Sequence, residues 1–523
     1  MKTRMFLLFI AMIISAVVAR AQSGSPASPS PREPAKSGKQ TASQPAAKAT
    51  DIKNEDCGCE AKNIIPADVA GIANGIKITA KEIADHIKDE RDGLQKKVIE
   101  SRRRELNLQI NSRLLEAEAM KKGTTPTKLI EQEIVGKAQE PTDAEARAFY
   151  EQNKARIPGA FKDFKPQIVA YLKAQRQESA AKAYADKLRA EADVKVLVEK
   201  VTAPEKESDR ANVLATINGA KITSGDLEES LKPLIYDVQL RVYALMKNEL
   251  ELRVNDILLE QEAQKRKTTA KALVEAELTP NVKKISEQDA AKFYEENKDR
   301  IDGGDFDMLK DQLIDHLQKN EQRRAELVFA ERLRQGAKIE INLKEPEPPV
   351  LQIATDEQPS KGNANAPVTI VEFTDFECST CQQSQPVLER LAKEYSDKVR
   401  LVVRDYPLEK HKNAFKAAEA AEAAREQAKY WEYVAVLFAN QKELGVEKLK
   451  EYASKVGLDR KKFDAELQAS KYAGRVQRDM QDGMKAGVSG TPTIFINGKR
   501  AADTTYAALR AAIEEALTKP AMN

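Results

Sequence analysis

The stretch VTIVEFTDFECSTCQQSQPVLERLAKEY occupies residues 368–395 and predicts the fold of the C-terminal third of the chain. Its first seven residues are mostly β-branched or aromatic, which is typical of a buried strand. A short turn follows, and Cys378 and Cys381 then begin a helix that extends to about Tyr395. A Cys-x-x-Cys pair at the start of a helix, directly after a buried strand, is the first indication of chemistry in this sequence.

The sequence around this stretch predicts an α/β domain with a helical insertion. A second strand is expected at 399–403, and a largely helical stretch follows at 411–485. The segment GTPTIFING at 490–498 then predicts a strand that begins after Thr491-Pro492 and ends in an Asn-Gly turn. The proline-rich segment EPEPP at 345–349 separates this domain from the rest of the chain, so we expect the domain to cover 346–523.

The position of the two cysteines favours redox chemistry. The first turn of a helix presents unpaired N–H groups and a partial positive charge, and both stabilise a thiolate. Cys378 is therefore predicted to be the nucleophile, and Cys381, which is more buried, would resolve the mixed disulfide. The alternative is a structural or metal-binding pair. A zinc site needs four ligands, and no second Cys-x-x-Cys or nearby histidine cluster supplies them.

These residues resemble the DsbA type of thioredoxin-fold proteins, and the resemblance covers about residues 350–519. It implies a cis peptide bond between Thr491 and Pro492, where the backbone docks substrate like an added strand. It also implies that Glu372 is a buried acid that assists proton transfer, and that no cofactor is needed beyond the redox-active disulfide Cys378–Cys381. The dipeptide between the cysteines is Ser-Thr rather than Pro-His, so the direction of electron flow stays open.

The N-terminus predicts export. Lys2 and Arg4 precede an apolar run at 5–19, and an A-x-A site that ends at Ala21 precedes Gln22. This pattern is typical of a cleaved signal peptide covering 1–21 and predicts a periplasmic or secreted protein. The alternative is an uncleaved anchor, but a membrane-spanning helix needs about 20 apolar residues.

Residues 22–60 form a tether rich in Ser, Pro, Ala, Lys and Gln, which cannot bury enough apolar surface to fold. The tether ends in a second cysteine pair, Cys57 and Cys59, separated by one glycine. This pair could exchange electrons with Cys378 and Cys381 or bind a soft metal. It could also be two incidental thiols, and the sequence leaves these alternatives open.

The middle of the chain contains a tandem duplication. Asn74-Gly75 recurs as Asn218-Gly219, an offset of 144, and the same offset relates LLEAE at 114–118 to LLEQE at 258–262. The FYE motif at 149 recurs at 293 with this offset as well. We therefore predict two repeats, about 68–201 and 212–343, within two domains that cover 61–203 and 204–345.

Each repeat is predicted to be mainly helical. A short strand leads into the Asn-Gly turn, Thr79 or Thr223 then caps a helix, and a long charged helix follows. In the first repeat Leu106, Ile110 and Leu114 recur at helical spacing, which predicts one buried stripe. The last helix of each repeat is expected at 164–190 and 308–335.

The repeats resemble the N-terminal chaperone domain of the SurA/PrsA/trigger-factor-like group. Many members of this group carry a parvulin prolyl-isomerase domain before the final helix. Here only six residues separate Ile157 from Phe164, which leaves no room for that domain. The resemblance implies binding of unfolded or partly folded exported proteins without isomerase activity. The alternative is that the repeats are helical spacers.

Other function classes are not supported. The 85 basic and 82 acidic residues nearly cancel, so no global field favours nucleic acid. The sequence has no Gly-rich phosphate loop, G-x-S-x-G or H-E-x-x-H motif, which argues against nucleotide-dependent and hydrolytic chemistry. His86 and His316 lie in different repeats and do not align, so we predict no metal site there, and His411 receives no role.

The sequence therefore predicts an exported thiol–disulfide oxidoreductase fused behind two chaperone-like helical domains. Its expected partners are folding exported proteins and a membrane protein that recycles the cysteine pair; no nucleic acid or nucleotide partner is expected. Two alternatives remain: a holdase or peptide-docking scaffold whose thioredoxin fold does not turn over, and a disulfide isomerase or reductase.

Overall fold

The computed structural model of the chain describes residues 64, 68–154, 157, 159–298, 301 and 304–518. The predicted signal peptide at 1–21 and tether at 22–60 lie outside the described residues, and so do Cys57 and Cys59. The chain forms two compact units. Among the described residues, the first combines Lys96–Asp237 with 348–518, and the second combines 68–95 with Val238–Glu347.

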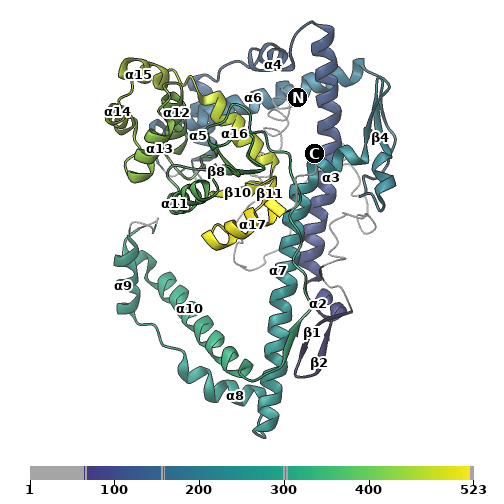
Figure 1. Cartoon of the computed structure of the whole chain (residues 1–523), viewed down its shortest axis with the longest axis vertical. Coiled ribbons are helices and arrows are strands. Elements are labelled where there is room, and N and C mark those ends of the chain that lie inside the picture. Colours follow the sequence, from purple (N-terminus) through teal and green to yellow (C-terminus); the bar gives the residue numbers. More distant parts are fainter. Residues whose placement is uncertain are drawn as a thin grey trace, which may run out of the picture. The chain divides into compact units, whose positions relative to one another are not determined.

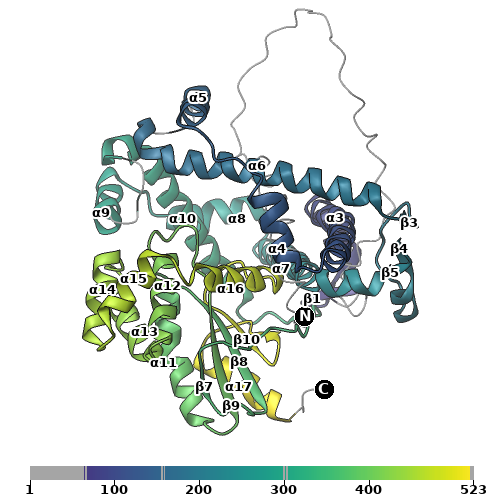
Figure 2. The ribbon, with the colours of Figure 1, turned by 90° about the horizontal axis from the view of Figure 1, so that it is seen from above.

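The first unit begins with a helical part in which long helices surround a small sheet. In chain order its elements are α3 (Lys88–Lys121) from residue 96 onward, α4 (Pro126–Ile130), η1 (Glu131–Val135), α5 (Asp143–Asn153), α6 (Phe161–Glu191), β3 (Val194–Val196), η2 (Glu207–Ala211), β4 (Val213–Ile217), β5 (Ala220–Thr223) and the start of α7 (Ser224–Lys265). Figure 2 shows α6 as one long helix, with α5 packed near its N-terminal end.

The apolar stripe predicted for the long charged helix is buried. Leu106, Ile110 and Leu114 of α3 pack with residues of α4 and α6 and with Leu214 and Ile217 of β4. The remaining faces of α3 carry Lys, Arg and Glu, as expected for a helix that buries a single stripe.

The second unit also combines helices with a small sheet, but here the hairpin comes first in the chain and the single strand comes last. It contains β1 (Val69–Ala73), β2 (Ile76–Thr79), α2 (Ala80–His86), the first turns of α3, α7 from residue 238 onward, α8 (Ala270–Glu277), η3 (Thr279–Asn281), α9 (Glu287–Asn297), α10 (Phe306–Arg334) and β6 (Ile339–Ile341). Ala263, Leu273, Leu278 and Phe329 form an apolar cluster between α7, α8 and α10.

The two repeats exchange their N-terminal hairpins. The hairpin β1–β2 of the first repeat pairs with β6, the last strand of the second repeat, so that Gly71 lies opposite Ile341. Conversely, the hairpin β4–β5 of the second repeat pairs with β3, the last strand of the first, so that Val194 lies opposite Ile217. Each compact unit therefore combines parts of both repeats. The predicted domain boundaries 61–203 and 204–345 follow the repeats of the sequence, and they stay a prediction.

The duplicated sequence makes duplicated contacts. Asn74 and Asn218 both adopt a positive φ, at 47° and 49°, and each is followed by a glycine with φ 84°, as a two-residue hairpin turn requires. The side-chain oxygen of Asn74 accepts from the backbone N–H of Lys338 at 2.8 Å, and that of Asn218 accepts from Asp193 at 3.0 Å. The turn therefore holds the third strand of each sheet as well as the hairpin.

The predicted helix starts are present. Thr79 accepts from the backbone N–H of Glu82 at 3.1 Å, and Thr223 accepts from that of Asp226 at 3.3 Å. The last helix of each repeat begins two or three residues earlier than predicted, at Phe161 and Phe306.

The C-terminal domain contains a five-stranded sheet in the order β11-β10-β8-β9-β7. Its strands are β7 (Ser360–Gly362), β8 (Val368–Thr374), β9 (Val399–Asp405), β10 (Thr493–Ile496) and β11 (Lys499–Arg500). The central pair β8 and β9 is parallel, because α11 (Ser379–Glu394) crosses over between them, whereas β10 is antiparallel to β8. Helices α11 and α17 (Tyr506–Thr518) cover one face of the sheet, and α16 (Ala473–Lys485) covers the other (Figure 1).

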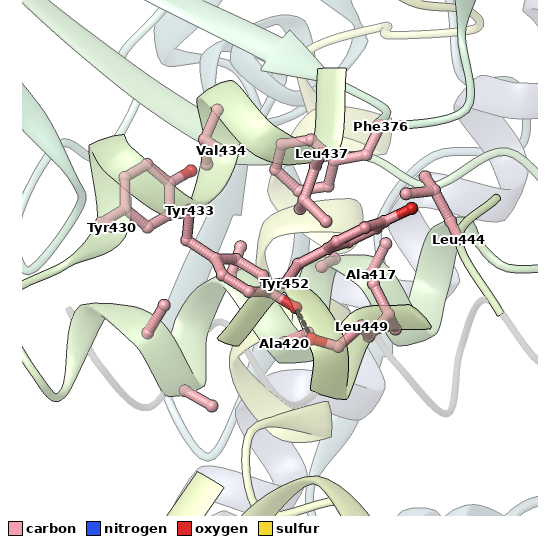
Figure 3. Packing of buried hydrophobic residues seen from close by; sticks show 14 of the residues in the cluster. Phe376, Ala417, Ala420, Tyr430, Tyr433, Val434, Leu437, Leu444, Leu449 and Tyr452 are labelled. Carbon is pink, nitrogen blue, oxygen red and sulfur yellow. Dashed lines mark hydrogen bonds between the residues drawn. The ribbon is translucent and has the colours of Figure 1, made fainter. Parts of the chain in front are cut away.

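The predicted helical insertion lies between β9 and β10. It contains α12 (Ala414–Arg425), α13 (Tyr430–Ala439), α14 (Val446–Lys455), α15 (Arg460–Gln468) and α16. Figure 3 shows Tyr433 and Leu437 of α13 packed against Leu449 and Tyr452 of α14, with the Tyr433 hydroxyl donating to the Leu449 carbonyl at 2.9 Å. This cluster also contains Phe376 and both cysteines of the Cys-x-x-Cys pair, so the insertion packs against the candidate site.

Candidate active site

Cys378 is the N-cap residue of α11. Strand β8 ends at Thr374, and in the following turn a carboxylate oxygen of Asp375 accepts from the backbone N–H of Glu377 at 2.7 Å. This turn brings Cys378 to the helix start, where its backbone is extended. Cys378 keeps 7% of its surface exposed, whereas Cys381, one turn into the helix, is fully buried. Both cysteines are free thiols.

The Cys378 sulfur lies among polar groups that can stabilise it in either protonation state. Its Sγ is 2.9 Å from the hydroxyl oxygen of Thr380, and as a thiol it donates to the backbone carbonyl of Thr491 at 3.2 Å. The Thr380 hydroxyl lies 3.2 Å from the same carbonyl. Thr380 is the second residue of the Ser-Thr dipeptide between the two cysteines, so this dipeptide contacts the Cys378 sulfur directly.

The two thiols have opposite electrostatic environments. The pKa of Cys378 is lowered to about 4, first by the hydrogen bond from the Cys381 thiol and then by those from Thr380 and Thr491, with burial opposing the shift. The pKa of Cys381 is raised, mainly by burial and further by its bond to Cys378 and the charge of Glu372. At neutral pH Cys378 is therefore a thiolate and Cys381 a thiol.

Glu372 lies fully buried in β8, on the face covered by α11. Its carboxylate accepts from the hydroxyl of Ser384 at 3.0 Å and from the side-chain amide of Gln385 at 2.8 Å. Burial raises its pKa to about 7, the two hydrogen bonds oppose the rise, and the charge of Cys378 adds to it. A carboxyl group with this pKa can give or take a proton near neutral pH.

The peptide bond between Thr491 and Pro492 is cis, as the resemblance implied. It directly precedes β10, in which Thr493 lies opposite Phe373 of β8. The Thr493 hydroxyl donates to the carbonyl of Gly490 at 2.7 Å, which fixes the turn before the strand. The Thr491 carbonyl is thereby held beside Cys378.

Sequence reasoning missed the side chains that hold the segment before Cys378. Asp375 is buried, and its second carboxylate oxygen accepts from the N–H of Leu408 and contacts Nδ1 of His411, each at 2.7 Å. Glu377 accepts from the backbone and side-chain N–H groups of Asn413 at 2.7 and 2.8 Å. The only sequence signal was that His411 lies in a polar loop after the second strand.

A second contact to this segment comes from the helical insertion. The side-chain amide of Gln441 donates to the backbone carbonyls of Phe376 at 2.8 Å and Cys378 at 2.9 Å. Gln441 follows α13 and lies 63 residues from Cys378 along the chain. No pattern in the sequence connects it to the cysteines.

His86 and His316, for which no metal site was predicted, belong to the helical repeats. Within the residues that the structure describes, no group of three or more His, Cys, Asp or Glu could hold a metal ion. In the same residues no helix is long and apolar enough to cross a membrane.

Comparisons with known proteins support the C-terminal fold. Residues 354–515 match the family model described as thioredoxin. Among solved structures, BdbD of Bacillus subtilis in its oxidised form is 23% identical, with a TM-score of 0.31; the match covers 33% of this chain and all of that one. A thioredoxin-like oxidoreductase of Silicibacter pomeroyi is 27% identical, with a TM-score of 0.30, covering 31% of this chain and 94% of that one. The match to the family model shows that the C-terminal domain has a thioredoxin-like fold. The resemblance of the repeats to SurA stays a prediction.

The curated relatives are similar over a limited length. The Na(+)/H(+) antiporter NhaA 3 of Salinispora tropica is 41% identical over 152 residues, which are 29% of this chain and 23% of that protein. NhaA of Herminiimonas arsenicoxydans is 36% identical over 140 residues, 27% of this chain and 22% of that protein. This chain therefore spans about a quarter of the length of the curated relatives that it matches.

Proposed function

We propose that this chain is a thiol–disulfide oxidoreductase in which Cys378 is the nucleophile and Cys381 the resolving cysteine. The observation that carries the proposal is the environment of the Cys378 sulfur. It is partly accessible, lies at a helix N-terminus and receives hydrogen bonds that lower its pKa to about 4. Such a sulfur is a good leaving group in disulfide exchange and resists protonation at neutral pH.

The first step begins with the Cys378–Cys381 disulfide. A substrate thiolate attacks the Cys378 sulfur, a new disulfide joins substrate and Cys378, and the electron pair of the broken bond goes to Cys381. Because the pKa of Cys381 is raised by burial, its thiolate takes up a proton at once. Glu372, with a pKa near 7, is the proposed donor of that proton.

The second step releases an oxidised substrate. A second substrate thiolate attacks the substrate sulfur of the mixed disulfide, and Cys378 leaves as a thiolate that Thr380 stabilises. The substrate loses two electrons and the enzyme gains them as one thiolate and one thiol. During both steps an extended peptide is proposed to dock beside Thr491 and Pro492, as an added strand.

The lowered pKa of Cys378 also favours one direction of electron flow. A stable thiolate stabilises the reduced enzyme, and this makes the enzyme the more oxidising partner. We therefore propose oxidation of substrates, followed by reoxidation through a disulfide of a membrane protein. The potential measured against glutathione should be more oxidising than about −180 mV. A value near about −270 mV would instead support the reductase alternative.

The decisive experiment compares Cys378→Ala with Cys381→Ala in oxidation of a reduced substrate protein. Cys378→Ala should abolish turnover. Cys381→Ala cannot oxidise the reduced substrate either, but its Cys378 thiolate should attack a disulfide of the oxidised substrate, release one substrate thiolate and accumulate as a mixed disulfide, because the resolving thiol is missing. Turnover by Cys378→Ala at the wild-type rate would refute the mechanism. It would favour the scaffold alternative, in which the domain only docks peptides.

The proposed location is outside the cytoplasm, where disulfides persist. It is supported by the signal-peptide pattern at 1–21. A mature N-terminus at Gln22, found by sequencing the exported protein, would establish both cleavage and export. The role of Cys57 and Cys59 as a relay to Cys378 remains a proposal, and a trapped Cys59–Cys378 disulfide is its test.

A client-binding role for the helical repeats is the second proposal, and large apolar side chains exposed on α10 favour it. Met308, Leu327 and Val328 each expose about two thirds of their surface. The test uses the full chain carrying Cys378→Ala and Cys381→Ala, so that redox chemistry cannot contribute. This protein should suppress aggregation of an unfolded client, and Leu327→Ser with Val328→Ser should weaken the effect. No suppression at several-fold excess would leave the repeats as spacers.

A further inference from the structure

The backbone segment from Asp375 to Cys378 is held from two sides. On one side, the loop after β9 contributes the N–H of Leu408, the ring of His411 and the amide of Asn413. On the other side, the helical insertion contributes Gln441. The segment that carries the nucleophile is thus fixed by residues of other elements.

The contact with the insertion is reciprocal. The side-chain amide of Gln441 donates to the carbonyls of Phe376 and Cys378, and the side-chain amide of Gln382 in α11 donates to the carbonyl of Phe438 at the end of α13. The rings of Phe376 and Phe438 pack beside these bonds with their centroids 5.3 Å apart. Three hydrogen bonds and one ring contact therefore tie the active-site turn to the end of α13 and the residues that follow it.

The turn that carries Gln441 is itself fixed. The side chain of Asn440 donates to the carbonyl of Val436 at 2.8 Å, and the N–H of Glu443 donates to the carbonyl of Asn440 at 2.9 Å. Gln441 therefore does not have to be ordered when it binds the active-site segment, and its hydrogen bonds cost little conformational entropy.

The two carbonyls that Gln441 binds matter for the nucleophile. The carbonyl of Cys378 also accepts the first backbone bond of α11, from Gln382 at 3.2 Å, so its orientation sets how the helix begins. Carbonyl oxygens carry partial negative charge, which disfavours a neighbouring thiolate, and a donor on each oxygen offsets that charge. Without the donor, the Phe376 carbonyl loses its partner and the N-cap residue can rotate away from Thr380.

We propose that Gln441 is a positioning residue for Cys378: its side-chain amide fixes the backbone on both sides of Glu377 and thereby sets the reactivity of the Cys378 thiol. The helical insertion is then part of the redox site, and its sequence tunes the site from outside the Cys-x-x-Cys motif. The proposal deepens the proposed function, but its primary readout is the titration of Cys378, which requires no turnover.

The experiment compares Gln441→Met, which keeps the length of the side chain but has no donor, with Gln427→Met. Gln427 is a matched control because it also lies in the insertion and bonds to backbone groups, those of Asp459. The thiolate absorbance of Cys378 is titrated in each full-length variant. Gln441→Met should raise the pKa of Cys378 by about 1, a tenfold rise in proton affinity. A tenfold change in the exchange equilibrium also corresponds to a potential about 30 mV more reducing.

Gln441→Asn keeps the amide on a shorter side chain and should give a pKa between those of the wild type and Gln441→Met. Fluorescence of Trp431, the single tryptophan, reports whether each variant is folded. A folded Gln441→Met protein with the wild-type pKa would overturn the proposal, and so would an equal pKa change in Gln427→Met. If Gln441→Met does not fold, a folded Gln441→Asn protein in which Cys378 keeps the wild-type pKa would overturn the proposal. Failure of the oxidoreductase function appears separately, as Cys378→Ala protein that retains turnover.

Discussion

The C-terminal domain and the helical repeats use charged residues in opposite ways. Of the buried polar residues that the structure describes, all but Arg102 and Ser224 belong to the C-terminal domain. The repeats place their charges on the outer faces of long helices, where they form exposed ion pairs such as Lys182–Asp186. The interior of the C-terminal domain therefore holds many polar and charged groups, whereas the described interior of the repeats is mainly apolar.

Arg404 illustrates how the C-terminal domain tolerates charge in its core. Its guanidinium is buried, donates to the carboxylates of Asp479 and Asp482 at 2.7 Å each, and donates to the carbonyl of Ala354 at 2.8 Å. The charges of Arg404, Asp479 and Asp482 are thus paired and hydrogen-bonded, which offsets the cost of burying them. Glu372 differs because only neutral groups donate to its carboxylate, so no positive charge opposes the rise of its pKa that burial causes.

The largest expected effect comes from a core residue next to these groups. Phe373 is fully buried in β8 and contacts the rings of Tyr406 and Phe495. Phe373→Ala should reduce the free energy of unfolding of the C-terminal domain by about 4 kcal/mol. Urea unfolding followed by Trp431 fluorescence measures this domain alone. Leu327→Ala, at an exposed position of α10, should leave that transition unchanged, and equal losses in both variants would break the comparison.

The second effect depends on pH. The pKa of Glu372 is about 7 in the folded protein, above its ordinary value of 4.5, so the folded state binds more protons between these values. The stability that this excess proton binding provides is present below pH 4.5 and is lost as the pH rises through 7. Glu372→Gln cannot ionise, so at pH 8 it should be more stable than the wild type by up to about 3 kcal/mol.

At pH 4 the two proteins should have nearly equal free energies of unfolding. If the difference in free energy of unfolding between the two proteins were the same at pH 4 and at pH 8, this would contradict the assignment of the buried charge to Glu372. The same variant should slow the first step of the proposed exchange, since the Cys381 thiolate released in that step then lacks its proposed proton donor.

A smaller effect is expected from a helix cap in the repeats. Thr269 accepts from the backbone N–H of Ala272 at 3.1 Å and starts α8. Thr269→Ala should cost about 1 kcal/mol in urea unfolding followed by circular dichroism, and Thr268→Ala is the neighbouring control. The urea midpoint of the transition followed by Trp431 fluorescence should not change. A shift of that transition would show that the two regions unfold together.

The smallest effect tests the exposed ion pairs. Lys182 lies 2.8 Å from Asp186, one helical turn later on α6, and both side chains are mostly exposed. Lys182→Ala should change stability by no more than about 0.5 kcal/mol, and less in high salt. A loss of several kcal/mol would mean that the exposed charges of the repeats contribute strongly to stability. The two regions would then not differ in the role of their charged residues.

Local elements and the cysteine site could be predicted because their signals are local. The β-branched run, the Cys-x-x-Cys pair and the Asn-Gly turns each act within a few residues. The second strand was predicted to end at residue 403, but β9 extends to Asp405. Arg404 and Asp405 look like the polar end of a strand, and only the partners on α16 explain why they are buried.

Two features lay beyond sequence reasoning. The two hairpins share the Asn-Gly turn and the same pattern of apolar residues, so nothing in that pattern shows which of the strands β3 and β6 each one joins. Gln441 is one glutamine among many, and its role depends on a turn that the insertion forms far from Cys378. In both cases the missing information is which distant segments meet, and single-sequence periodicity does not contain it.

The exchanged hairpins have a consequence for when the protein can finish folding. The turn of the first hairpin bonds to Lys338, 264 residues later in the chain. As the chain is synthesised or threaded across a membrane from its N-terminus, β1 and β2 emerge long before the strand that completes their sheet. The β1 edge of the first hairpin therefore stays unpaired until nearly the whole second repeat has been added to the chain. Premature termination within the second repeat would therefore leave both repeats incomplete.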